Sequence, residues 1–173
     1  FLRKMIINKE ETLNPTPFIF STHNSIASQI ALQLKCHAYN STYSHRNFSF
    51  ESALLDAFLL IKEEETNNVL VGAADELTED SFDLLKRIGY YKSTDIAGEG
   101  ASFFVLSDKK EPSVFAELRS IEFISNTEIE TIITKAKKLV IENNIDAIVV
   151  GSHPNSLHAN DKAMLDALNI ENE

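Results

Sequence analysis

Apolar residues along this chain follow two patterns, a helical period near 3.6 residues and short continuous runs bounded by polar residues or glycine. The helical period predicts helices at residues 24–34, 49–62, 79–87, 128–142 and 161–168, after a charged helix end at residues 1–11. The short runs predict strands at residues 38–43, 69–74, 101–106, 114–123 and 147–150. This alternation of helices and strands indicates an α/β fold with a largely buried sheet.

The segment at residues 49–62 (SFESALLDAFLLIK) combines helical spacing with apolar residues on almost every face. A helix of this kind is buried inside a domain rather than laid on its surface. We therefore expect a buried helix at residues 49–62. The strands at residues 38–43, 69–74 and 101–106 are expected to flank it in one sheet.

The segment at residues 24–34 has small alanines between large apolar residues that are four positions apart. The large residues are Ile26, Ile30 and Leu34. This spacing predicts a helix that packs closely on a neighbour, with Asn24 or Ser25 as its N-cap. The two prolines of the preceding segment, residues 14–17, predict a loop without helix there.

The composition narrows the class of protein. A chain of 173 residues with 43% hydrophobic residues is long enough for one globular domain. The formal net charge of −10 disfavours a surface that coats nucleic acid. The single cysteine, Cys36, excludes an intramolecular disulfide and indicates a reducing cytoplasm. No apolar run comes close to the length of about 18 residues that a membrane-spanning helix needs. The N-terminus has no signal-peptide pattern.

A polar loop after the predicted strand at residues 147–150 carries candidate catalytic residues. The strand ends at Gly151, His153 comes two residues later, and Asp161 follows eight residues after His153. Catalytic side chains of α/β proteins often lie where strands run out into loops. His153 is therefore a candidate catalytic residue. The alternative is that its ring only caps local backbone groups.

Five segments, in order along the chain, resemble segments of the β-ketoacyl synthases of the thiolase superfamily. Residues 98–106 (GEGASFFVL) resemble the family's Gly-Asp/Glu-Gly-Ala segment and the apolar strand after it, and residues 153–161 resemble its His-Gly-Thr-x-Thr-x-x-x-Asp motif. The other three are the helix that begins near Asn24, the strand at residues 69–76 and the strand at residues 114–118. Residues 48–57 (FSFESALLDA) are most similar to the divergent ketosynthase-like proteins of aryl-polyene and flexirubin-type pathways.

The resemblance implies a thiolase-like α/β fold, in which two similar halves form α-β-α-β-α layers. Residues 1–125 are then expected to be the remainder of the N-terminal half, and residues 126–173 the start of the C-terminal half. The family's second histidine, its lysine and its glycine-rich closing loop would follow residue 173. The chain is therefore expected to be the central part of a longer protein.

A working ketosynthase has a nucleophilic cysteine at the turn into its buried helix, where the helix N-terminus favours the thiolate. When residues are counted without gaps from Asn24, and the register is fixed on the alanines of the 49–62 helix, Asn47 falls at the position of the cysteine. An asparagine amide cannot form the acyl thioester. Cys36 comes about three helical turns earlier in the sequence and is expected to be a small buried hydrophobe.

The residues around Asn47 are candidate substrate-binding residues, with an exposed loop as the alternative. They are His45, Arg46, Phe48 and Ser49. Ser49 is the hydroxyl nearest to Asn47 in sequence, but no general base is recognisable beside it. We therefore do not expect a nucleophilic serine at Ser49.

In the family, the histidine that matches His153 hydrogen-bonds the malonyl carbonyl and stabilises the enolate that forms as carbon dioxide leaves. The resemblance implies this role for His153, with Asp161 in support. The motif is only partly kept, because Pro154, Asn155 and Leu157 replace its glycine and its two threonines.

The resemblance leaves two main classes of function open, and a degenerate acyl-binding module is a third alternative. An accessory subunit, similar to chain-length factors, would pair with an active ketosynthase and shape the acyl tunnel without making a thioester; the lost cysteine favours this class. A malonyl-carrier-protein decarboxylase that uses His153, or a condensing enzyme with a relocated nucleophile, is favoured by His153 and Asp161. The implied partners are an acyl carrier protein with a phosphopantetheine-linked acyl chain, and a second subunit in a homodimer or heterodimer. The dimer contact is expected around residues 38–44, and no cofactor or metal is implied.

Overall fold

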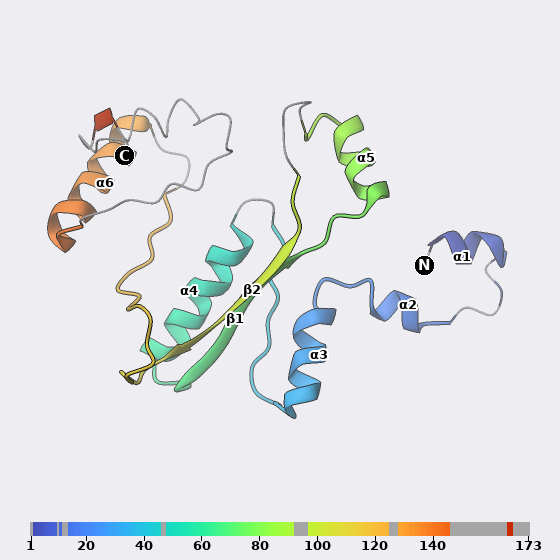
Figure 1. The fold of residues 1–173 in the computed structure, drawn as a ribbon, viewed down its shortest axis with the longest axis horizontal. Helices are drawn as coiled ribbons and strands as arrows, with labels where there is room; N and C mark the ends of the chain where they lie inside the picture. Colours follow the sequence, from blue (N-terminus) through green and yellow to red (C-terminus); the bar gives the residue numbers. More distant parts are fainter. Residues whose placement is uncertain are drawn as a thin grey trace. The chain divides into compact units, whose positions relative to one another are not determined.

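The computed structural model of the chain describes residues 2–9, 11, 14–45, 48–91, 97–124, 128–145 and 166–167. Its elements, in order, are α1 (Leu2–Ile7), α2 (Thr16–Ile19), α3 (Ser25–Leu34), α4 (Ser49–Lys62), β1 (Asn68–Asp75), α5 (Glu79–Arg87), β2 (Gly100–Ser107) and α6 (Ile129–Asn143) (Figure 1). They divide into two compact units. The first unit is Phe1–Asp75 with Gly100–Phe115, and the second is Glu76–Glu99 with Ala116–Glu173.

Strands β1 and β2 form an antiparallel pair in the first unit, with a register that runs from Asn68 opposite Ser107 to Asp75 opposite Gly100. Both strands were predicted from their apolar runs, and the structure extends each of them by a residue at either end. Side chains directly opposite each other share a face of the sheet. Val71 and Phe104 therefore lie on one face, whereas Gly72 and Phe103 lie on the other.

Helix α4 packs on the face of the sheet that carries Val71 (Figure 1). Ala57 of α4 and Val71 of β1 are the buried hydrophobic residues of the described part of the chain, with exposed fractions of 2% and 5%. The ring of Phe50 meets that of Phe104, with centroids 6.3 Å apart. The helix predicted at residues 49–62 is confirmed with its bounds, but its expected burial on almost every face is wrong, because Ala57 is its one buried residue. Most of its residues are only half-buried, because this two-stranded sheet covers one side of it.

The segment at residues 38–43, which we predicted to be a strand of the same sheet, has no strand structure. This prediction was wrong. The segment is held by side chains instead of a backbone ladder: the amide of Asn40 donates to the carbonyl oxygen of Ala27 in α3 at 3.1 Å, and Tyr43 interacts with Asp56 of α4.

Helix α3 is confirmed at its predicted position, and Asn24 is its N-cap residue, although the Asn24 side chain makes no capping hydrogen bond. The expected close packing of its apolar stripe is wrong. Ile26 and Leu34 are 49% and 67% exposed. The chain segment after α3 lies instead along the opposite, more polar side of the helix. The helix ends because Lys35 adopts a left-handed conformation, with φ 53°.

Helix α2 occupies a segment for which we predicted no helix. Pro15 is its N-cap residue and Pro17 lies within its first turn. A proline is tolerated there, because the first N–H groups of a helix have no acceptor within it and the ring fixes a φ that suits the helix. The prediction was wrong because it applied to the helix start a rule that holds for the helix interior.

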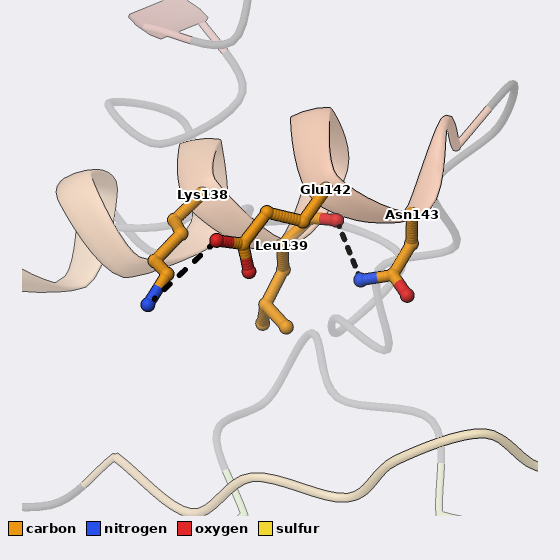
Figure 2. Close-up of polar contacts among 4 residues, drawn as sticks. All are labelled: Lys138, Leu139, Glu142 and Asn143. Atoms are coloured by element: carbon orange, nitrogen blue, oxygen red, sulfur yellow. Dashed lines mark hydrogen bonds and ion pairs between the residues drawn. The ribbon is translucent and has the colours of Figure 1, made fainter.

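In the second unit, helix α5 has the bounds that were predicted. The hydroxyl of Thr78 accepts a hydrogen bond from the backbone N–H of Ser81 at 3.2 Å, which caps the helix. Helix α6 also confirms its prediction, with bounds that differ by one residue. Figure 2 shows two of its side-chain contacts: the Nζ of Lys138 lies 3.8 Å from an oxygen of Glu142, and the amide of Asn143 donates to the carbonyl oxygen of Leu139 at 2.9 Å.

The strand predicted at residues 114–123 is absent. A strand requires a partner for its backbone groups, and β1 and β2 pair only with each other within the described residues. Phe115 is fully exposed. The strand predicted at residues 147–150 lies outside the described residues, and of the helix predicted at residues 161–168 only 166–167 are described, in helical conformation.

Candidate functional site

The candidate site is the place where residues 39–45 pass the first two turns of α4, directly before the predicted nucleophile position. Ser49, Ser52 and Asp56 occur along this largely apolar helix at intervals of three and four. Residues at this spacing lie on one face of a helix. Each of the three interacts with a residue of the 39–45 segment.

Ser49 is tied to the backbone of His45. Its Oγ accepts a hydrogen bond from the N–H of His45 at 2.9 Å and donates one to the carbonyl oxygen of the same residue. The Ser49 hydroxyl therefore ties the end of the 39–45 segment to the first turn of α4. Because its proton is already donated to a carbonyl, the hydroxyl is not poised to attack a substrate.

The imidazole of His45 contacts a different serine. Its Nε2 lies 2.9 Å from the Oγ of Ser52. The ring of Tyr43 meets the imidazole edge-on, with centroids 6.0 Å apart and planes at 73°. His45 is exposed, whereas Tyr43 and Ser52 are half-buried. The pair is thus open to solvent on the side of the histidine.

Tyr43 links this cluster to Asp56. Partial burial of the phenol raises the pKa of Tyr43 above its usual value of 10.0, and hydrogen bonding to Tyr39 raises it further. The negative charge of Asp56 and a hydrogen bond to its carboxylate act in the same direction, whereas a hydrogen bond with Ser41 lowers the pKa. Tyr43 is therefore neutral at physiological pH.

The residues predicted from sequence fall into two groups. His45, Phe48 and Ser49 lie in this cluster or at its border, where Phe48 is the N-cap residue of α4. Arg46, Asn47, His153 and Asp161 lie outside the described residues. Sequence reasoning missed Tyr43, Ser52 and Asp56, although the spacing of Ser49, Ser52 and Asp56 on an apolar helix was a signal that could have indicated them.

Cys36 was predicted to be buried, but it is exposed. It lies in an open cavity of about 320 Å³ between α3 and the segment that follows. The prediction was wrong because the more polar face of α3, with Asn24, Ser28 and Lys35, faces Cys36 in this cavity. The apolar stripe of α3, which could have helped to bury a thiol, lies on the opposite face and is itself exposed at Ile26 and Leu34.

The described residues form neither a metal-binding cluster nor a membrane-spanning helix. Within the described ranges, no group of three or more His, Cys, Asp or Glu side chains is placed to hold a metal ion. None of the helices in the described part of the chain is both long and apolar enough to cross a bilayer.

The fold and the sequence identify the family. Residues 2–94, more than half of the chain, match the N-terminal domain of β-ketoacyl synthases. The chain belongs to this family and has its thiolase-like α/β fold. A solved structure described as "The ishigamide ketosynthase/chain length factor" superposes with a TM-score of 0.63 at 20% sequence identity, over 96% of this chain and 49% of that one. The present chain thus spans about half the length of that relative, and no curated protein matches it.

Proposed function

We propose that this chain is part of an accessory ketosynthase-like subunit, comparable to a chain-length factor, which pairs with an active ketosynthase and forms no acyl thioester itself. Membership of the β-ketoacyl synthase family and the fold shared with a ketosynthase/chain length factor structure support this role. The heterodimer, an acyl carrier protein as donor and a pathway of the aryl-polyene type are parts of the same proposal. The cytoplasmic location stays a prediction.

The observation that carries the proposal is the state of Ser49. The ungapped count from Asn24 puts Asn47 at the nucleophile position, so an acylated enzyme would need a substitute close to it. The nearest hydroxyl in sequence, that of Ser49, is hydrogen-bonded to both the N–H and the carbonyl oxygen of His45. Within the described residues, the nearby imidazole of His45 is directed to Ser52 and not to Ser49. Neither Asn47 nor Ser49 can therefore replace the cysteine thiolate.

The experiment is incubation with a fatty-acyl acyl carrier protein, followed by intact-mass and peptide mass spectrometry. We expect no adduct on Asn47, Ser49 or Cys36 when fragment ions assign each adduct to a single residue, which also separates Ser49 from Ser52 on the same peptide. An Asn47→Cys variant is the matched gain-of-function control, and an intact ketosynthase is the positive control. A stable acyl adduct at Cys36 or Ser49 would contradict the proposal.

Association is tested separately by co-expression with an intact ketosynthase of the same genome. The accessory role predicts a complex of one copy of each subunit, measured by sedimentation. A protein that remains a monomer or forms only homodimers in the presence of that ketosynthase would refute the chain-length-factor role.

A further inference from the structure

The imidazole of His45 and the hydroxyl of Ser52 form a pair that the accessory role does not use. The Nε2 of His45 lies 2.9 Å from the Oγ of Ser52. A serine becomes a nucleophile when a general base lies within about 2.6–3.2 Å of its oxygen. The observed separation falls within this range.

The position of the imidazole does not depend on Ser52 alone. The backbone of His45 is fixed at both its N–H and its carbonyl oxygen by the hydroxyl of Ser49. The edge-on ring of Tyr43 supports the imidazole from the side. A base whose backbone and ring are held by separate groups is preorganised for proton transfer, as catalytic constellations require.

The pair is also accessible. His45 is exposed and Ser52 is half-buried in the second turn of α4. Two acidic residues of α4 lie near it among the described residues: Glu51 precedes Ser52, and Asp56, one turn further along α4, interacts with Tyr43.

We propose that Ser52 is a nucleophile toward acyl thioesters and activated esters, with His45 as its general base. In the tautomer that carries its proton on Nδ1, His45 accepts a hydrogen bond at Nε2 from the Ser52 hydroxyl. As the Oγ of Ser52 bonds to the acyl carbon, its proton passes to Nε2 and a tetrahedral intermediate forms. The carbon–sulfur bond then breaks, the leaving thiolate takes the proton from Nε2, and the acyl group remains on Ser52 as an oxygen ester.

Water completes the reaction. The same imidazole removes a proton from a water molecule that attacks the ester, and that proton returns to the Oγ of Ser52 as the carbon–oxygen bond breaks. The net reaction is hydrolysis of the acyl thioester to a carboxylic acid and a thiol. This activity requires neither Asn47 nor a partner subunit, so it goes beyond the proposed accessory role and stands independently of it.

The test is covalent labelling of the purified protein with a fluorophosphonate, followed by peptide mass spectrometry. We expect one adduct, on Ser52, and none in Ser52→Ala. In His45→Gln the labelling rate should fall on the order of a hundredfold or more, since a positioned general base contributes at least that factor. Ser44→Ala, which removes an exposed hydroxyl next to His45, is the matched control and should be labelled at the parent rate.

A second measurement distinguishes His45 as a general base from His45 as a residue that only holds Ser52 in place. With His45 as base, the labelling rate of the parent protein should rise with pH as the imidazole loses its proton, and this rise should be lost in His45→Gln. No adduct on the parent protein, an adduct on another residue, or equal rates in the parent and His45→Gln would each overturn the proposal. Thioester formation and pairing with a ketosynthase are separate measurements, so failure here leaves the accessory role to be decided by them.

Discussion

Gly72 occupies a position in β1 that should not accept a larger side chain. It lies opposite Phe103 of β2. A Cβ atom added at Gly72 would lie 2.5 Å from the carbonyl oxygen of Ser102, and closer still to the ring of Phe103. The ring is 43% exposed and can move aside. The carbonyl is backbone of the paired strand and cannot move without disturbing the ladder.

These contacts set the size of the effect of Gly72→Ala. Inserting a methyl group into a packed region costs about 1–3 kcal/mol. Replacing glycine in a strand recovers about 0.5–1 kcal/mol, because alanine loses less conformational freedom on folding. The two ranges give a net loss in the free energy of unfolding of about 0–2.5 kcal/mol, and the 2.5 Å approach to a backbone carbonyl points to its upper half.

The assay is urea denaturation of the parent protein and Gly72→Ala, with the slope of the transition checked for equality. The matched control is Gly98→Ala, because an added Cβ there meets no atom within 4 Å and the backbone needs no left-handed φ. Gly98→Ala should be neutral or slightly stabilising. In a Phe103→Ala background the cost of Gly72→Ala should shrink but not vanish, because the Ser102 carbonyl remains. A Gly72→Ala protein as stable as the parent would refute the packing of β1 against β2 described above.

Three further predictions concern single residues. The phenol of Tyr43 should titrate above pH 10.0, and Asp56→Asn should lower its pKa, as measured by phenolate absorbance. Because the pKa of Tyr43 is raised in the folded state, the stability that Tyr43 contributes is complete below the unfolded pKa. That stability is lost as the pH rises through the folded pKa. An unchanged titration in Asp56→Asn would show that Asp56 does not act on Tyr43. Thr78→Ala should cost about 1 kcal/mol of stability through loss of the α5 cap, whereas Thr78→Ser should cost less; equal stabilities would contradict the cap. If the protein decarboxylates malonyl-carrier protein, His153→Ala should slow that reaction on the order of a hundredfold, and an unchanged rate would mean that His153 is structural.

The sequence by itself determined the elements whose signals are local. The helical period of the apolar residues predicted the helices at residues 49–62 and 79–87 with their observed bounds. The two apolar runs that became β1 and β2 were found to within a residue at each end. Each of these signals depends on neighbouring residues in the chain, so no knowledge of tertiary structure was needed.

Only the tertiary structure decided what each segment contacts. Residues 38–43 and 114–123 have the composition of strands, but a strand forms only where another strand meets its backbone groups. The stripe of Ile26 and Leu34 predicted a packed face, yet the chain returns along the polar side of α3. In the same way, the sequence showed His45 and Ser52 as residues seven positions apart on either side of a turn. In the structure, the hydroxyl of Ser49 holds the backbone of His45, and the imidazole lies 2.9 Å from the Ser52 oxygen. The distance between two side chains across a turn depends on how the chain folds back on itself, which no local pattern encodes.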